Sequence, residues 1–328
     1  MDVMTFENTY ISCCAAAAGK LEKQGPLGEM FDHTTDDSYF GMDSWEQAES
    51  EMSRIAVNLL LKKAGMSYKD VGLFLGGDLL NQCTATGFAA NSLGVPYLGL
   101  YGACSTAAEA LIVGSAFVSA LYAENAVAAA SSHFCSSERQ FRFPLEYGSQ
   151  RTPVSQNTVT GAGAFLIAHA GKVRVTRAMI GKVTEKGVTE ANNMGAAMAP
   201  AAADTLLNFL SLSGESAGAY DAVATGDLGY EGSVLLGELL IQNGVFAGET
   251  LCDCGTLIYD RKKQDVNAGG SGCGCSACVL GTYFWDKLCR KEIKRMLLIG
   301  TGALLSPKTV MQKQTIPCVA HLLELEAV

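Results

Sequence analysis

The sequence contains few charged residues and no excess of basic ones. Only 17% of its 328 residues are charged, and the net charge is −9 with an isoelectric point near 5.0. A nucleic-acid-binding surface needs a basic stripe to neutralise phosphates, so this balance excludes nucleic acid as a partner. The low charge, together with 48% hydrophobic residues and 36 glycines, indicates a large buried core with tight turns rather than disorder.

The sequence also lacks the features of a secreted or membrane-spanning chain. Residues 1–7 contain neither a basic n-region nor an apolar h-region, so we expect no signal peptide. The twelve cysteines are therefore expected to be reduced thiols. Residues 110–130 are mostly apolar, but Glu124 interrupts them, and a charge inside a lipid-exposed helix costs roughly 2.5–3.5 kcal/mol. We expect a buried helix followed by a buried strand here, and no transmembrane segment.

Helix and strand patterns alternate along the first half of the chain. Residues 45–64 begin with acidic residues and end with Lys62 and Lys63, directly before Gly65. This pattern is typical of a helix whose charged ends match its dipole. Short apolar runs typical of strands follow at 71–75, 96–101, 125–130 and 163–168. Strands that alternate with helices predict parallel sheets covered on both faces.

The second half repeats the landmarks of the first half in the same order. The repeated landmarks are a Gly-Asp-Leu turn, a cysteine-containing turn before an apolar helix, and two apolar strands. In the first half they lie, in this order, at 77–79, 102–105, 125–132 and 163–168. In the second half they lie at 226–228, 272–276, 295–302 and 317–326. Such ordered repetition predicts an internal duplication. We expect an N-terminal half, 1–171, and a C-terminal half, 172–328, related by pseudo-two-fold symmetry.

Cys104 lies between a short strand pattern and a long apolar helix pattern. A cysteine at a helix N-terminus is exposed to the positive end of the helix dipole and to free backbone N–H groups, and both favour the thiolate. We therefore expect Cys104 to have the character of an acyl-accepting nucleophile, provided that a base faces it.

A duplicated chain with a cysteine at the start of a buried helix resembles the thiolase and β-ketoacyl synthase superfamily. The resemblance covers nearly the whole chain and implies an α/β, thiolase-like five-layer αβαβα fold. In that fold the helices that start near Cys104 and Cys275 would form the buried central layer. The superfamily also implies a homodimer, on fold analogy alone.

Several longer motifs resemble the stage V sporulation protein AD family. They lie at residues 25–28, 77–82, 102–106, 131–133, 138–142, 198–205, 268–273 and 300–307. This resemblance implies a protein of sporulation and spore germination that binds dipicolinic acid (pyridine-2,6-dicarboxylate). It further implies that the protein moves dipicolinate into and out of spores with other stage V sporulation membrane proteins. Its expected location is peripheral, at the forespore and spore inner membrane.

The chain departs from the superfamily's enzymes where they carry a general base. The Gly-His-Pro loop of thiolases corresponds to residues 267–275, which contain no histidine. Initiating ketoacyl synthases carry a histidine after the second-half strand, where this chain has Asp227. An aspartate beside a thiolate opposes the anion rather than helping it. We therefore predict a non-catalytic binding protein without a cofactor.

A thiolase-like acyltransferase with Cys104 as nucleophile is the alternative. Cys318 matches the second catalytic cysteine of thiolases, although Ala320 and His321 replace the glycines of that turn. His133 follows the strand after the Cys104 helix and is expected at the level of the same pocket. The competing interpretation is that Cys104 is a small buried residue and that both histidines are satisfied polar groups.

A pocket for dipicolinate, a planar dianion, needs convergent N–H groups, a helix N-terminus and one or two cations. The two cysteine-led helices supply the first two features. Arg139 and Arg142 are the candidate cations. The competing interpretation is that these arginines pair with Glu138 or Glu146 at the surface.

Asp78 and Asp227 form a pseudo-symmetric pair after equivalent strands. They either orient donors in the site, contact a Ca²⁺ ion bound with the ligand, or cap the helices that follow them. No zinc site is expected, because the C-x-C pairs at 252–254 and 273–275 lack the usual ligand loop. The predicted ligand-binding residues are Cys104, His133, Asp78, Asn81, Arg139, Arg142, Asp227, Ser271, Gly272 and His321.

Overall fold

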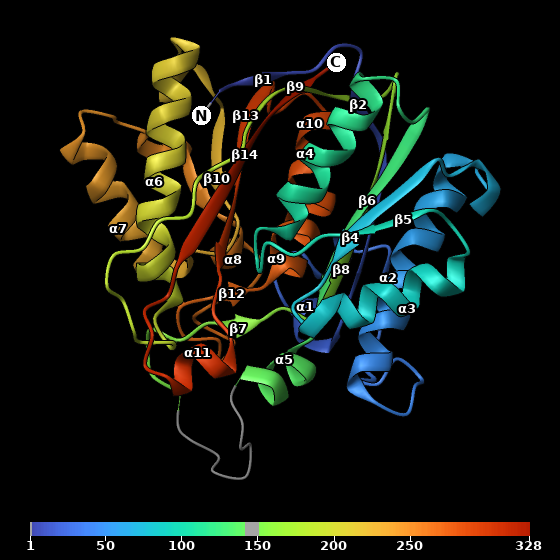
Figure 1. Ribbon diagram of the computed structural model, residues 1–328, viewed down its shortest axis with the longest axis horizontal. Helices are drawn as coiled ribbons and strands as arrows, with labels where there is room; N and C mark the ends of the chain where they lie inside the picture. Colours follow the sequence, from blue (N-terminus) through green and yellow to red (C-terminus); the bar gives the residue numbers. More distant parts are fainter. Residues whose placement is uncertain (1, 142–150) are drawn as a thin grey trace.

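A computed structural model describes residues 2–141 and 151–328. Two sheets enclose a central layer of helices, and further helices cover the outer face of each sheet (Figure 1). The helices are α1 (Lys20–Lys23), α2 (Trp45–Ala64), α3 (Thr84–Leu93), α4 (Thr106–Ser119), α5 (Phe134–Phe141), α6 (Met194–Ser213), α7 (Gly229–Gln242), α8 (Cys254–Leu257), α9 (Cys273–Val279), α10 (Trp285–Cys289) and α11 (Pro307–Met311). α2 and α3 cover one sheet, α4 and α9 lie in the centre, and α6 and α7 cover the other sheet. The predicted five-layer αβαβα architecture is confirmed.

Each half of the chain contributes five strands in the same spatial order. The orders are β5–β4–β6–β8–β2 and β11–β10–β13–β14–β9, and a short antiparallel pair between β2 and β9 joins the two sheets. The strands are β2 (Tyr10–Ala18), β4 (Leu73–Gly77), β5 (Tyr97–Gly99), β6 (Asn125–Ser132), β8 (Gly161–Ala168), β9 (Val173–Met179), β10 (Ala222–Thr225), β11 (Leu251–Asp253), β13 (Arg295–Ala303) and β14 (Cys318–Ala327). Positions 171 and 172 fall in the turn between β8 and β9.

The sheets are mixed, which corrects the prediction of parallel sheets. β4 pairs in parallel with β5 and β6, but β8 runs antiparallel to both β6 and β2. β13, β14 and β9 repeat this antiparallel part in the second half. The helix α5 lies between β6 and β8 in the chain, and α11 lies between β13 and β14, so the alternation of strands and helices did not reveal that these strands run antiparallel.

Four short strands complete the fold. β1 (Met4–Thr5) pairs with β9, and β3 (His33–Thr34) pairs with β2. β7 (Asn157–Thr158) and β12 (Gly270–Ser271) form a separate two-stranded sheet. This small sheet places residues 157–158 of the N-terminal half against the turn before α9.

α2 forms as its sequence predicts. The Ser44 hydroxyl accepts a hydrogen bond from the Gln47 N–H at the first turn, and Gly65 ends the helix in the left-handed conformation. The buried face contains Met52, Ala56 and Leu60, which pack on the outer face of the first sheet. Burial of this face, rather than helix propensity alone, holds α2 in place.

The central layer explains why the segment 110–130 is so apolar. It forms most of α4 and most of β6, both of which are largely buried, with the interrupting Glu124 at the turn between them. All seven residues of α9 are buried as well, and small residues allow close packing there. No helix in the described part of the chain is long and apolar enough to cross a membrane.

Candidate functional site

Cys104 lies in the loop between β5 and α4, with 5% of its surface exposed. The residue before it, Ala103, has a left-handed backbone with φ of +52°. This conformation is strained for a residue with a Cβ atom, and such strain is concentrated at functional sites. α4 begins at Thr106 and α9 at Cys273, so neither helix starts at the cysteine that the sequence predicted.

The structure brings Cys104 together with three predicted residues of the C-terminal half. The Ser271 hydroxyl lies 4.0 Å from the Cys104 sulfur. Asp227, fully buried, forms a hydrogen bond with the Cys104 thiol. Its carboxyl group is held by the N–H of Gly272 at 2.8 Å and by the Thr301 hydroxyl at 2.8 Å. Cys104, Asp227, Ser271 and Gly272 therefore form one cluster between the halves.

The electrostatics of this cluster keep the Cys104 thiol protonated. Burial, followed by the charge and hydrogen bond of Asp227, raises the pKa of Cys104 well above its ordinary value. Burial also raises the pKa of Asp227 to about 7. The prediction that Cys104 is a thiolate is therefore wrong, because burial outweighs the helix dipole. The prediction that Asp227 opposes the thiolate is confirmed.

The two predicted histidines do not form hydrogen bonds with this cluster. His133 Nε2 hydrogen bonds to the carbonyl of Ser38 at 2.8 Å, and its Nδ1 accepts the Cys135 N–H at 3.2 Å. His321 lies on β14, where its Nδ1 accepts the Gly181 N–H at 3.3 Å and burial lowers its pKa to about 4. His133 is therefore a satisfied buried histidine, which corrects its predicted role in acyl transfer.

Cys318 faces away from the central layer. Side chains alternate along β14, and Cys318 shares its face with Ala320 and Leu322, which pack in the core beneath α6. His321 belongs to the opposite face, with Leu323 and Leu325 of the central core. The alternative set of Cys104, His133, Cys318 and His321 is not assembled as the catalytic group that the sequence suggested.

The two pseudo-symmetric aspartates have different roles. Asp78 accepts the N–H of Leu80 at 2.8 Å and the N–H and hydroxyl of Thr86 at 2.7 Å, so it caps the start of α3. The start of α7 is instead bound by Asp253, which accepts the N–H groups of Leu228 and Gly229. The capping interpretation is confirmed for Asp78 and wrong for Asp227.

Sequence reasoning missed Glu49 of α2, a fully buried glutamate beside Asp78. Its carboxyl group accepts a hydrogen bond from the Ser136 hydroxyl at 2.7 Å. Burial and the charge of Asp78 raise the pKa of Glu49 well above its ordinary value. A glutamate near the start of α2, in line with the apolar positions Met52, Ala56 and Leu60, is the sequence signal that identifies it.

Arg139 and Asn81 line a cavity of about 490 Å³ next to α5. The other lining residues are Glu46, Leu80, Thr84, Ser136, Gln140 and Pro307. The Arg139 guanidinium forms a two-point ion pair with Glu46 and lies 5.0 Å from the ring centre of Trp45. Its partner is thus Glu46, not the Glu138 of the competing interpretation. Arg142 and Glu146 lie outside the described residues.

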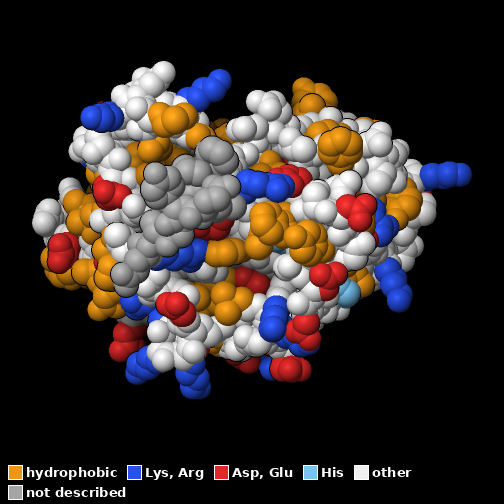
Figure 2. Space-filling model, turned by 90° about the horizontal axis from the view of Figure 1, so that it is seen from below, with side chains coloured by type: hydrophobic (Ala, Val, Ile, Leu, Met, Phe, Trp, Pro, Cys, Tyr) orange, Lys and Arg blue, Asp and Glu red, His pale blue; other side chains and the backbone are white. Residues whose placement is uncertain are grey.

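The end of the molecule that carries α5 and α11 combines all types of side chain (Figure 2). Basic, acidic and hydrophobic groups are intermingled on this face. In the described ranges, no three His, Cys, Asp or Glu side chains are arranged to hold a metal ion. All twelve cysteines are free thiols in this structure.

Comparison with known proteins identifies the family. The model of the stage V sporulation protein AD family matches residues 2–326. The chain belongs to this family. It is 43% identical over 313 residues to stage V sporulation protein AD of Bacillus subtilis (strain 168), covering 95% of this chain and 92% of that protein.

The thiolase-like fold is supported by solved structures. A variant of OleA from Xanthomonas campestris is 15% identical, with a TM-score of 0.64 and coverage of 98% of this chain and 99% of that one. OleA with bound cerulenin is 15% identical, with a TM-score of 0.63 and 98% coverage of both chains. At this identity the likeness concerns the fold.

Proposed function

We propose that this sporulation protein binds dipicolinate without chemical conversion and supports its movement into and out of spores. The proposal is supported by membership in the stage V sporulation protein AD family and by the cavity at Arg139. In this proposal the protein lies peripherally at the forespore and spore inner membrane and acts with other stage V sporulation membrane proteins.

The observation that carries the binding proposal is the donor set of the Arg139 cavity. The Nη1 group of Arg139 is not used in the ion pair with Glu46, and the Asn81 side-chain amide forms no hydrogen bond within the described residues. Gln140 fixes the loop, because its amide donates to the Leu79 carbonyl and accepts the Asn81 N–H. A guanidinium and a free amide suit a carboxylate, and the volume lies within the range of ligand pockets.

The cluster at Cys104 suits a dianion less well. Asp227 is adjacent to the thiol, and above its pKa of about 7 it is ionised and repels a carboxylate. We therefore place the ligand at Arg139, with Asn81 as second donor, rather than on the Cys104 sulfur.

Calorimetric titration with dipicolinate tests this proposal. Saturable heat is expected for the native protein, and Arg139→Gln should weaken binding at least about tenfold, which corresponds to roughly 1.4 kcal/mol. Arg290→Gln removes an exposed arginine directly after α10 and is the matched control. No heat at millimolar dipicolinate, or equal affinity in Arg139→Gln, would overturn the assignment. Parallel titrations with Ca²⁺ determine whether the ion binds with the ligand.

The acyltransferase alternative retains one supporting observation, the strained Ala103 directly before a buried cysteine. Incubation with an acyl-CoA followed by intact mass spectrometry separates it from binding alone. An acyl adduct that disappears in Cys104→Ala would replace the binding-only proposal.

We also propose that the protein forms a homodimer through β5. This strand pairs only with β4, so its other edge has no strand partner among the described residues. Leu98 on the strand, Tyr101 after it and Phe88 of α3 are exposed nearby. An unpaired edge with apolar neighbours favours pairing with a second chain.

A further inference from the structure

A second groove, of about 670 Å³, lies on the C-terminal half, and none of the predicted site residues is among its lining residues. It runs between α7, β11 and the loop after α8. Its lining includes Tyr230, Val234, Leu251, Thr256, Arg261 and Lys262. Aromatic and aliphatic side chains with a few charged groups are the usual lining of a binding site.

The apolar lining continues along α7 beyond the groove. Tyr230, Val234 and Ile241 lie on one face of the helix and are 51%, 47% and 57% exposed, and Phe246 after the helix is 74% exposed. Gly237 on the same helix has open space where a Cβ atom would be. The helix has 14 residues, so this apolar stripe is about 20 Å long. That length favours an elongated polypeptide segment, such as an amphipathic helix, over a small molecule.

The groove is basic at one end, although the chain is acidic overall. The Arg261 guanidinium lies 4.4 Å from the ring centre of Tyr230, and its Nε donates to the Asn267 carbonyl. Neither Arg261 nor Lys262 forms an ion pair within the described ranges.

The carboxylates that line the groove do not compensate for these cations. Asp253 is buried and binds backbone N–H groups, and Asp260 pairs with Lys263. Two cations are therefore available to acidic residues of a partner.

We propose that this surface, formed by the apolar stripe of α7 and the basic end at Arg261 and Lys262, docks an acidic amphipathic segment of another protein. The apolar residues of the segment lie along α7, and its carboxylates pair with the two cations. This interaction does not depend on dipicolinate binding at Arg139.

A random peptide library displayed on phage, selected against the full-length protein, tests this proposal. Enriched peptides should combine acidic residues with apolar residues at helical spacing. They should bind at least about tenfold more weakly to Val234→Glu and to Arg261→Glu/Lys262→Glu, a loss of roughly 1.4 kcal/mol. Tyr122→Glu and the double variant Lys20→Glu/Lys69→Glu carry the same charge changes at exposed sites of the N-terminal half and should bind normally.

Three results would overturn the proposal. Enriched peptides could bind the groove variants and controls equally. Sedimentation with anionic phosphatidylglycerol vesicles could show that the same variants lose vesicle binding while no peptide is enriched, which would assign the surface to a membrane. Light scattering could show that Val234→Glu changes the oligomeric state, which would assign it to a second copy. If Val234→Glu does not fold by circular dichroism, Ile241→Ser replaces it.

Discussion

Asp227 of the C-terminal half forms a hydrogen bond with the thiol of Cys104 in the N-terminal half. This cysteine is buried, and its neighbour Asp227 raises the thiol's pKa instead of lowering it. The pairing thus connects the two halves at Cys104 and disfavours the thiolate, which is the reactive form of the side chain.

Replacing Asp227 should make Cys104 more reactive. Asp227→Asn removes the negative charge that opposes the thiolate, so alkylation of Cys104 by iodoacetamide at pH 8 should accelerate about threefold to tenfold, consistent with a pKa decrease of up to about one unit. Peptide mapping by mass spectrometry measures the rate at this cysteine. Asp253→Asn, which alters a buried aspartate at α7, is the control. An unchanged rate in Asp227→Asn would show that burial alone sets the reactivity.

Asp227 also makes the stability of the protein depend on pH. Its pKa is raised to about 7 in the folded state, from about 3.9 in an unfolded chain, so between these values the folded state binds more protons. The free energy of unfolding should therefore decrease as pH rises from about 4 to about 7. Asp227→Asn lacks this contribution, so its stability relative to the native protein should increase over that range. Urea unfolding at several pH values measures the difference, and a constant difference would contradict the raised pKa.

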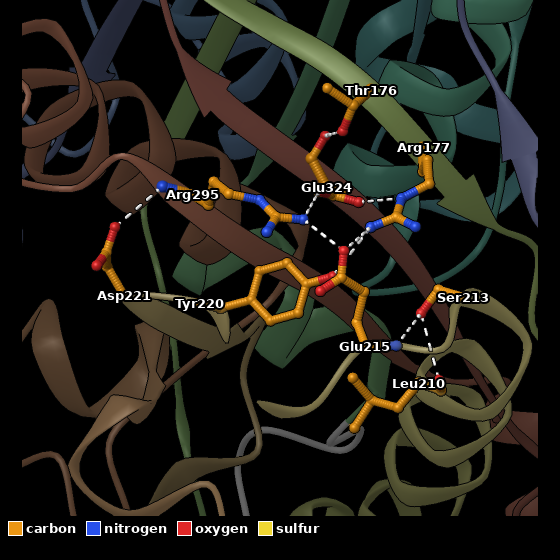
Figure 3. A network of polar contacts seen from close by, with 9 residues as sticks. All are labelled: Thr176, Arg177, Leu210, Ser213, Glu215, Tyr220, Asp221, Arg295 and Glu324. Atoms are coloured by element: carbon orange, nitrogen blue, oxygen red, sulfur yellow. Dashed lines mark hydrogen bonds and ion pairs between the residues drawn. The ribbon is translucent and has the colours of Figure 1, made fainter. Parts of the chain in front are cut away.

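Glu324 holds two arginines on neighbouring strands (Figure 3). Its carboxylate pairs with Arg177 of β9 and with Arg295 of β13, and its side chain is only 3% exposed. Removing one partner of a buried pair leaves uncompensated charge, so Glu324→Gln should lower the free energy of unfolding by about 3 kcal/mol.

Glu215 provides the matched control for Glu324. It pairs with the same two arginines but is 29% exposed, so Glu215→Gln should cost about 1 kcal/mol or less. Equal losses in the two variants, measured by urea unfolding, would contradict the role of burial.

Much of the fold could be predicted from the sequence because its signals are local. The caps of α2 and the apolar run of α4 and β6 lie within single segments, and the order of landmarks revealed the duplication. The cluster of Cys104 with Asp227 and Ser271 followed from that duplication, because equivalent turns meet between the halves.

The remaining features depend on distant contacts or on strand faces. The partner of Arg139 is Glu46, 93 positions earlier, and no local pattern identifies it. His133 forms a hydrogen bond with the Ser38 carbonyl, 95 positions earlier, and no local pattern identifies this partner either. Cys318 could have been excluded, because the alternation of side chains along its strand places it opposite His321.

The central layer leaves no room for a larger residue at Gly163. A Cβ atom on this residue of β8 would lie 2.7 Å from the backbone of Ala277 in α9. Gly163→Ala should therefore lower the free energy of unfolding by about 1–3 kcal/mol. Gly87 of α3 has open space, so Gly87→Ala should stabilise the protein by up to about 1 kcal/mol. Thermal unfolding measures both, and a neutral Gly163→Ala would show that α9 shifts to accommodate the methyl group.

We expect the homodimer to form through the unpaired edge of β5. If two copies pair there, Leu98→Lys places a charge in the interface and should shift the protein to a monomer in light-scattering measurements at micromolar concentration. Val183→Lys adds the same charge at an exposed valine of the C-terminal half and should leave the mass unchanged. A Leu98→Lys protein with the native mass would exclude this edge as the interface. Tyr101 follows β5 and precedes Cys104 by three positions, so pairing at this edge would also restrict the approach of solvent and reagents to Cys104. Cys104 should therefore be alkylated faster in the monomeric variant.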